Sequence, residues 1–220
     1  MKSIFISRSL TPDSLFFKLL QEPDTTVIDM PLISLVKIPF SYTPQTNWIF
    51  FTSKNAIRYF FEQSPDLPSG VKCGVISGSS ESVLKEFGKQ ADFIGEGVDL
   101  AKIAKSFREV LQDESVLFPQ AMDSLQTIQK YLAFTNTIYN LYTYKTIIKS
   151  DFELPYTDVV IFTSPSNVKA YFSKYKLDPR QLVIAMGTST KYKLSEYGIK
   201  DVLVPEEFSE KGLYDVVMNH

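Results

Sequence analysis

The chain has one cysteine, one histidine and no long apolar run among its 220 residues. A disulfide needs two thiols, so Cys73 excludes an internal one and is typical of a reducing cytosol. We expect Cys73 to pack as a small apolar residue on a strand. The one histidine, His220, is the last residue, which leaves no imidazole for a Ser-His-Asp triad, a Cys-His pair or an HExxH zinc site. Any catalysis therefore does not depend on histidine.

Hydropathy and charge exclude further classes of protein. No apolar run approaches the roughly 20 residues that span a bilayer, and residues 1–7 are too short for a signal h-region. We therefore expect a cytoplasmic protein with no membrane partner. A net charge of −2 and a pI near 5.5 argue against general nucleic-acid binding, which usually shows as a basic stripe. They do not argue against local anion binding by backbone N–H groups.

Motifs for cofactors and metals are also missing. Neither GxGxxG nor GxxxxGK[ST] occurs in the sequence. The acidic residues show no spacing that requires a paired acid–base site, and nothing clusters like a metal site. Nucleotide binding and a metal site are therefore poorly supported.

What is present is a repeat with a period of about 110 residues. FTSKNAIRYF at 51–60 returns as FTSPSNVKAYF at 162–172, and VISGSSESVL at 75–84 returns as AMGTSTKYKL at 185–194. A repeat of this length is too long for a solenoid unit and suits a small α/β domain. Two such domains facing each other predict a cleft lined by the repeated polar turns.

Short β-branched or aromatic runs alternate with segments of helical period, which predicts parallel sheets covered by helices. Strands are expected at 3–7, 26–30, 47–52, 72–77 and 92–94, and again at 115–118, 138–144, 158–163, 182–187 and 201–204. Helices are expected to begin near Thr11, Ser53, Ser80, Leu100, Ser124, Pro165, Ser189 and Ser209. Five strands per repeat with helices between them fit a flavodoxin-like doubly wound sheet.

The first repeated turn closes a strand and opens a helix in each copy. Its residues are Thr52, Ser53 and Asn55 in the first copy, and Thr163, Ser164, Pro165, Ser166 and Asn167 in the second. Such a turn leaves backbone N–H groups unpaired, and its hydroxyls add neutral donors for a carboxylate or phosphate. The same residues are also good N-caps, so a purely structural role explains either copy alone.

The second repeated turn has the same order of features along the chain: an apolar strand, then small residues and hydroxyls, then a helix. It comprises Ser77, Gly78, Ser79 and Ser80 in the first copy, and Gly187, Thr188, Ser189 and Thr190 in the second. Ligands of flavodoxin-like sheets gather at the carboxyl ends of the strands. Four hydroxyl-rich turns suit an extended polyanion better than one compact phosphate.

Other polar residues lie near the same edge. Arg8 follows the first strand and could pair with a ligand carboxylate, although a solvated surface arginine explains it equally well. The tyrosines of residues 141–146 alternate at strand period; most should pack in the core or linker, and one phenol could reach the cleft. Tyr171 could face the cleft or pack against the sheet.

Seven motifs occur in a fixed order: Arg8, FTSxN at 51–55, the turn at 77–80, LFPQ at 117–120, YTYKT at 142–146, FTSPS at 162–166 and GxxT at 187–190. Together they resemble the uroporphyrinogen-III synthase family from Ile4 to about Leu213. The resemblance implies two interleaved flavodoxin-like domains, 1–38 with 156–220 and 45–147, joined by a two-stranded linker of 39–44 and 148–155. The sequence leaves the oligomeric state open, and a monomer is the default expectation for a hinged clamp.

The same resemblance implies a cofactor-free lyase that closes linear hydroxymethylbilane, a tetrapyrrole, into uroporphyrinogen III with inversion of ring D. The turns would hold the acetate and propionate groups. Tyr171 would help the hydroxyl to leave, and Thr190 or Ser80 would assist through hydrogen bonds.

The sequence departs from the family pattern at several positions. Ser77 stands where the family usually has glycine, and Ser80 stands where it has threonine. Gln120 stands where arginine is common. The expected tyrosine position holds Ala170, with Tyr171 beside it, a shift that rotates the side chain by about 100° on a helix.

Two alternatives follow. A non-catalytic binding module is motivated by Gln120 and Ser77. A solute receptor would also have two α/β domains around a hinge, but the expected lack of a signal segment disfavours it.

Overall fold

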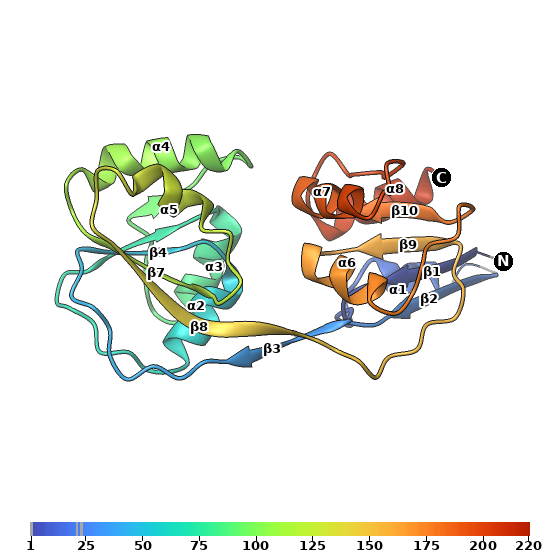
Figure 1. Ribbon diagram of the computed structural model, residues 1–220, viewed down its shortest axis with the longest axis horizontal. Coiled ribbons are helices and arrows are strands. Elements are labelled where there is room, and N and C mark those ends of the chain that lie inside the picture. The colour runs from blue at the N-terminus through green and yellow to red at the C-terminus, as the bar shows by residue number, and fades with distance from the viewer. Residues whose placement is uncertain (1, 21, 23) are drawn as a thin grey trace. The chain divides into compact units, whose positions relative to one another are not determined.

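The computed structural model describes residues 2–20, 22 and 24–220 and divides the chain into two compact units. Unit 1 comprises Met1–Ser34 and Ile147–His220, and unit 2 comprises Leu35–Thr146. In Figure 1 the blue and red ends of the chain accordingly belong to one unit and the green middle to the other.

Unit 1 is built on a parallel sheet in the order β10-β9-β1-β2. The strands are β1 (Lys2–Ile6), β2 (Thr25–Asp29), β9 (Val159–Phe162) and β10 (Leu182–Ala185). The predicted strand at 201–204 forms only an isolated parallel bridge between Leu203 and Ile184. Counted in chain order within the unit, the arrangement is 2-1-3-4-5, the flavodoxin order.

Unit 2 has a circularly permuted form of this order: β4 to β8, numbered along the chain, lie in the order 5-4-1-2-3. Its sheet runs β3-β8-β7-β4-β5-β6, and β8-β7-β4-β5-β6 are parallel neighbours. The strands are β3 (Ile33–Lys37), β4 (Trp48–Phe51), β5 (Lys72–Val75), β6 (Phe93–Ile94), β7 (Val116–Ala121) and β8 (Ile138–Ile148). The predicted fold class, two interleaved flavodoxin-like sheets, is therefore confirmed.

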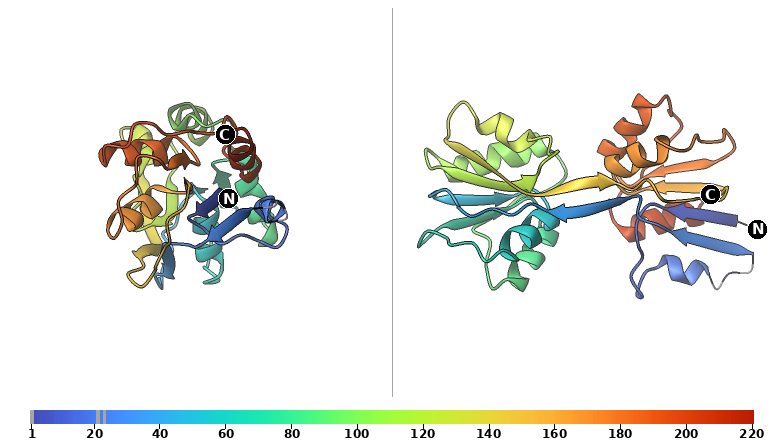
Figure 2. Two further views of the ribbon diagram at one scale, coloured as in Figure 1. Left: turned by 90° about the vertical axis from the view of Figure 1, so that its right-hand side faces the viewer. Right: turned by 60° about the horizontal axis from the view of Figure 1, so that its bottom comes forward.

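The chain passes between the units on β3 and β8, which Figure 2 shows as neighbouring ribbons. The Ile38 N–H donates to the Thr143 carbonyl (2.9 Å) and the Lys149 N–H donates to the Leu32 carbonyl (3.0 Å). Residue numbers rise on one strand as they fall on the other, so this pair is antiparallel. β3 was not expected, and β8 is longer than predicted. The units divide within β3 and β8, so residues 39–44 lie in unit 2 and residues 148–155 lie in unit 1.

Helices connect the parallel strands and begin close to the predicted positions, except that α1 begins at Phe16 rather than near Thr11. Their bounds are α1 (Phe16–Leu19), α2 (Lys54–Phe61), α3 (Gly78–Glu86), α4 (Leu100–Leu111), α5 (Thr127–Leu132), α6 (Pro165–Phe172), α7 (Thr188–Glu196) and α8 (Glu210–Met218). Over the described residues, no helix combines the length and apolar character needed to cross a membrane.

Both faces of each sheet are buried. In unit 1, Phe5 packs in one cluster while Ile4 and Ile6 pack in another, as strand alternation requires. In unit 2, Ile49 and Phe51 likewise lie opposite Trp48 and Phe50. Continuous apolar strands of this kind are typical of parallel sheets covered by helices on both faces. The cores fix the carboxyl ends of the strands, where the polar turns begin.

Cys73 lies in the core of unit 2 on β5, as predicted. Burial raises the pKa of its thiol to about 11, with the neighbouring Asp92 adding to the shift. A thiol that keeps its proton at neutral pH is a poor nucleophile, so Cys73 serves packing.

Candidate functional site

The first turn of unit 2 lies between β4 and α2 and is held by Ser53. Its hydroxyl accepts the Ala56 N–H at 3.1 Å and so caps the helix. Ser53 Oγ also lies 3.2 Å from the phenol oxygen of Tyr144 on β8. Thr52 is half-buried and Asn55 is exposed. The turn therefore combines a Ser53 hydroxyl held by two polar contacts with an exposed residue at Asn55.

The matching turn of unit 1 lies between β9 and α6 and is more tightly bonded internally. Ser164 caps α6 by accepting the Asn167 N–H (3.3 Å), and Pro165 occupies the first helical turn. Thr163 donates its hydroxyl to the Ser7 carbonyl (3.2 Å), and its N–H to the Ser7 hydroxyl (2.9 Å). Thr163 thus joins the ends of β9 and β1, while Ser166 lies half-buried at the start of the helix.

Asn55 and Asn167 are not equivalent, although both were predicted to line the site. Counted from the capping serines, Asn167 stands at the position of the buried Ala56, and Asn55 at the position of Ser166. Asn167 is accordingly buried. Its Oδ1 accepts the Leu32 N–H (3.2 Å) and its Nδ2 donates to Ser164 Oγ (2.9 Å). Asn167 is therefore a buried structural amide, whereas Asn55 is open to solvent.

The second turns of the two units are alike residue by residue. Ser80 and Thr190 are each 2% exposed, and the two residues before each of them are exposed: Gly78 and Ser79 in unit 2, Thr188 and Ser189 in unit 1. Ser77 Oγ lies 3.1 Å from Ser79 Oγ and 3.3 Å from Ser80 Oγ. Both turns therefore combine a buried hydroxyl residue, Ser80 or Thr190, with two exposed residues at the start of the helix.

Neither α3 nor α7 has a side-chain cap among the described residues. The N–H groups of the first helical turn have no acceptor within their own helix. Those of Gly78, Ser79, Thr188 and Ser189 are therefore available to an external acceptor. The helix dipole adds partial positive charge at the same points, so both turns are suited to hold carboxylates.

Arg8 lies beside the turns of unit 1 but is already paired. Its guanidinium donates to the Glu210 carboxylate. The same carboxylate accepts the Ser14 hydroxyl and the Leu15 N–H, both at 2.7 Å. Any ligand carboxylate would have to compete with Glu210, so in this structure Arg8 joins α8 to the segment before α1.

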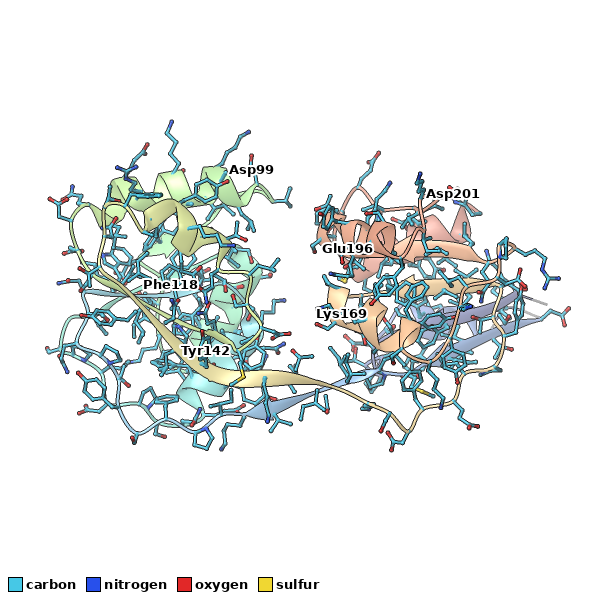
Figure 3. All side chains as sticks on the ribbon, in the orientation of Figure 1. Asp99, Phe118, Tyr142, Lys169, Glu196 and Asp201 are labelled. Atoms are coloured by element: carbon cyan, nitrogen blue, oxygen red, sulfur yellow. The ribbon has the colours of Figure 1, made fainter. Side chains whose placement is uncertain are left out.

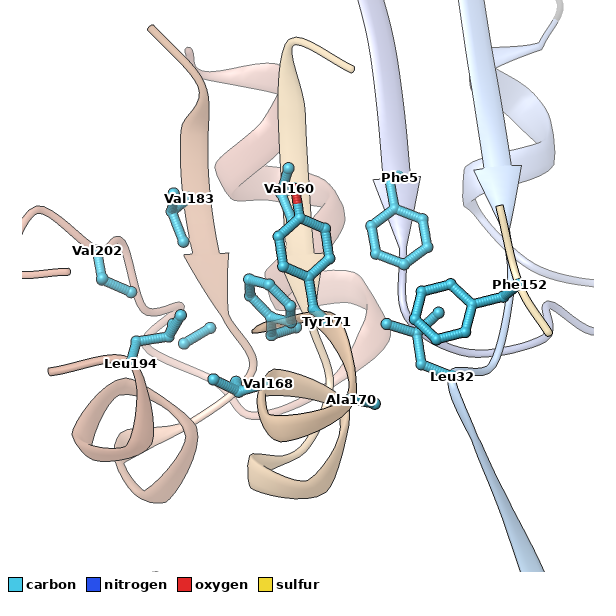
Figure 4. Packing of buried hydrophobic residues seen from close by; sticks show 12 residues of the cluster. Phe5, Leu32, Phe152, Val160, Val168, Ala170, Tyr171, Val183, Leu194 and Val202 are labelled. Atoms are coloured by element: carbon cyan, nitrogen blue, oxygen red, sulfur yellow. The ribbon is translucent and has the colours of Figure 1, made fainter. Parts of the chain in front are cut away.

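Tyr171 does not lie at the turns, contrary to the expectation for an acid that touches a ligand. It is 6% exposed and packs between Phe5 and Phe162, with ring centroids at 6.4 Å and 5.3 Å. In Figure 4 its oxygen points back along the strands toward Val160, away from the strand ends that carry the turns. Burial raises the pKa of its phenol, and Tyr175 adds to the shift. Tyr171 is a core residue, in keeping with the one-residue shift on the helix.

Gln120 lies in a buried amide network and makes no ionic contact. Its Nε2 donates to Asn140 Oδ1 (2.9 Å), and its Oε1 accepts from Gln129 Nε2 (2.7 Å). Its side chain is thus used to join β7, β8 and α5. Within the described residues, no group of three or more His, Cys, Asp or Glu side chains could hold a metal ion.

The fold and the turns define a class: a two-unit α/β protein with matching hydroxyl-rich turns at the carboxyl ends of the strands in both sheets. A family model described as uroporphyrinogen-III synthase HemD matches residues 16–215. The chain belongs to the uroporphyrinogen-III synthase family.

Individual proteins agree with this assignment. The chain is 25% identical to a uroporphyrinogen-III synthase of Chlorobaculum parvum, over 94% of both chains. It is 26% identical to the porphyrin biosynthesis protein HemD of Ruminiclostridium josui over 91% of this chain, which spans 45% of that longer protein.

Solved structures support the fold. The uroporphyrinogen-III synthetase of Helicobacter pylori matches with a TM-score of 0.74 at 17% identity, covering 100% of this chain and 99% of its own. A variant of the uroporphyrinogen III synthase of Thermus thermophilus matches with a TM-score of 0.66 at 18% identity, over 99% and 98% of the two chains.

Proposed function

We propose that this protein is an active uroporphyrinogen-III synthase, which converts hydroxymethylbilane to uroporphyrinogen III and water. The observation that carries the proposal is the family match over residues 16–215. The exposed N–H groups of the second turns in both units give that match a physical basis. A linear tetrapyrrole carries enough acetate and propionate groups to engage more than one turn.

The reaction demands control of geometry more than strong acid–base chemistry. Loss of the substrate hydroxyl as water leaves an azafulvene cation. The substituted carbon of ring D attacks it through a spiro intermediate, and rearrangement inverts that ring. No electrons are gained or lost overall. An unguided bilane closes at the free position instead, so the protein must hold the chain in the productive arrangement, an effect worth several kcal/mol.

In this proposal the turns supply that control. The N–H groups of Gly78, Ser79, Thr188 and Ser189 bind substrate carboxylates. Thr190 or its counterpart Ser80 assists loss of the substrate hydroxyl through a hydrogen bond. Tyr171 has no contact with substrate here, since its phenol is buried in the core.

We further propose that the protein acts as a cytoplasmic monomer, because one chain contains both sets of turns. Sedimentation at micromolar concentration should give a mass close to 25.0 kDa. A dimer at the same concentration would contradict this part of the proposal.

The test is the identity of the product. Hydroxymethylbilane is generated in situ and mixed with the protein, the products are oxidised, and uroporphyrin isomers I and III are separated by chromatography. The proposal predicts isomer III as the main product. Isomer I at the spontaneous rate would sink it and favour a binding module without ring closure, the alternative that Gln120 and Ser77 motivated.

A further inference from the structure

The capping serines of the two first turns make the same two kinds of polar contact, but the second contact comes from a different residue type in each unit. Ser53 accepts the Ala56 N–H at 3.1 Å in unit 2, and Ser164 accepts the Asn167 N–H at 3.3 Å in unit 1. Each hydroxyl also has a second polar side-chain neighbour, so capping alone does not explain the arrangement.

The second neighbour comes from a different element in each unit. In unit 1 it is Asn167 Nδ2, on α6 itself, which donates to Ser164 Oγ at 2.9 Å. In unit 2 it is the phenol of Tyr144, on β8, at 3.2 Å from Ser53 Oγ. The unit 2 turn has Ala56 at the position of Asn167, so the second polar contact of Ser53 comes from another element of the unit.

A serine hydroxyl has one proton to donate and two lone pairs to accept with. When Ser53 accepts from both Ala56 and Tyr144, its lone pairs are used and its own O–H remains to donate. Ser164 is in the same situation with the two Asn167 donors. Each hydroxyl is thereby prepared to give a hydrogen bond to an acceptor outside the turn, such as a carboxylate.

Tyr144 is brought to Ser53 by an irregularity in the strand pairing. Gln120 pairs with Tyr142 and Ala121 with Tyr144, so Thr143 is an extra residue on β8. Bulges of this kind re-aim side chains and are common beside active sites. Tyr142, labelled in Figure 3, is 39% exposed, whereas Tyr144 is 7% exposed and stacks on Tyr59 with centroids 5.0 Å apart.

The buried phenol is suited to act as a donor. Burial raises the pKa of the Tyr144 phenol. The hydrogen bond with Ser53 lowers this pKa, whereas the nearby Asp123 and Tyr59 raise it further, and the net shift is upward. Tyr144 therefore keeps its proton throughout the physiological range.

We propose that Tyr144 is a positioning residue for substrate binding, whose phenol donates to Ser53 and so directs the Ser53 O–H toward a substrate carboxylate. Asn167 has the same task for Ser164. The identity of the carboxylate ligand rests on the proposed function; the orientation of the hydroxyl rests on the contacts of unit 2 alone.

The experiment measures binding and turnover separately. Uroporphyrin III, which keeps the acetate and propionate groups of the product, is titrated by fluorescence against wild type, Tyr144→Phe, Ser53→Ala and the double variant. We expect Tyr144→Phe to weaken binding by about fivefold, the size expected for one neutral hydrogen bond. KM for hydroxymethylbilane should rise by the same factor with kcat unchanged. In the Ser53→Ala background Tyr144→Phe should cost nothing further, because the two residues act as one unit.

Tyr59→Phe is the matched control. It also removes one phenol oxygen, which donates to the Leu35 carbonyl at 3.2 Å, and it leaves the ring that stacks on Tyr144. A general loss of stability would affect both variants alike, whereas the proposal predicts that Tyr59→Phe leaves Kd unchanged.

Each outcome is decisive. Unchanged binding by Tyr144→Phe, a further loss in the double variant, or no binding by wild type would overturn the proposal. If wild type yields isomer III but Tyr144→Phe binds normally, only this inference fails. If wild type yields isomer I yet Tyr144→Phe weakens binding, the synthase assignment fails and the positioning role stands.

Discussion

Asp158 joins the beginnings of β9 and β1. Its Oδ2 accepts the Ser3 N–H (2.8 Å) and the Ser3 hydroxyl (2.7 Å). These hydrogen bonds, the hydroxyl first, lower the pKa of Asp158 below 3.8. A lowered folded-state pKa gives stability that is present above 3.8 and is lost as the pH falls through the folded value.

Asp158→Asn should therefore reduce the acid sensitivity of the protein. We expect the free energy of unfolding of wild type to drop more than that of the variant between about pH 5 and pH 2. Urea titrations at both ends of this range measure the difference. Equal drops would mean that Ser3 does not stabilise the ionised carboxylate.

Gly95, after β6, has no room for a side chain. A Cβ there would lie 2.5 Å from the Ile76 carbonyl oxygen and 2.9 Å from Ile103 Cγ2. Because a backbone oxygen cannot move aside easily, Gly95→Ala should lower the free energy of unfolding by about 1–3 kcal/mol. Gly78→Ala is the control, since nothing lies within 4 Å of its Cβ position. Equal stability of the two variants would contradict the packing around Gly95.

Single residues also mark the limit of reasoning from the sequence. The positions of the hydroxyl-rich turns could be predicted because each turn is a short continuous stretch of sequence. The repeat also extends to burial, since Ser80 and Thr190 are equally buried. The orientation of Tyr171 could not be predicted, since one step on a helix decides between core and surface. Tyr144 was within the predicted tyrosine cluster, but the bulge that selects it depends on strand register.

At the scale of elements, α4 is the clearest case of a helix begun by its cap. Asp99, labelled in Figure 3, accepts the N–H groups of Ala101 (2.9 Å) and Lys102 (3.3 Å) through Oδ1. The helix packs on the unit 2 core through Ile103, Phe107 and other buried residues.

Asp99→Ala should lower the free energy of unfolding by about 1 kcal/mol, the usual value of an N-cap. Asp99→Asn keeps an acceptor in the same place and should recover most of that loss. Thermal or urea unfolding of the three proteins provides the comparison. A similar loss in both variants would indicate that the charge of Asp99, rather than its cap, stabilises α4.

Elements of strong local pattern were predicted well and those that depend on partners were not. Buried runs such as Val159–Phe162 were recognised from their β-branched residues. β3 (Ile33–Lys37) was missed because it has its partner, β8, more than a hundred residues away in the chain. The predicted fifth strand of unit 1, residues 201–204, forms only the isolated bridge between Leu203 and Ile184.

At the scale of the whole molecule, the repeat and the fold are related in an unexpected way. Each repeat predicts a five-stranded sheet, yet each sheet mixes strands of the two repeats. The sheet of unit 1 takes β1 and β2 from the first repeat and β9 and β10 from the second, and the sheet of unit 2 takes β3 to β6 from the first and β7 and β8 from the second. Periodicity cannot reveal this exchange, because both arrangements have the same local patterns. The resemblance to a known family supplied it, and the strand order confirms it.

The central claim is that the exposed amides of the second turns bind the bilane during its conversion to uroporphyrinogen III. Thr188, at the first position of α7, allows one such amide to be removed. Gly187 before it has φ −168° and ψ 175°, which is compatible with a following proline. α6 already has Pro165 in its first turn, where proline is favoured.

The decisive measurement is the rate of isomer III formation at limiting hydroxymethylbilane by Thr188→Pro and Thr188→Ala. Both variants lose the hydroxyl, but only proline loses the N–H. Our account predicts isomer III from both, with the rate of Thr188→Pro lower by about tenfold, as for a charge-assisted hydrogen bond. Equal rates, or isomer I from wild type, would contradict it.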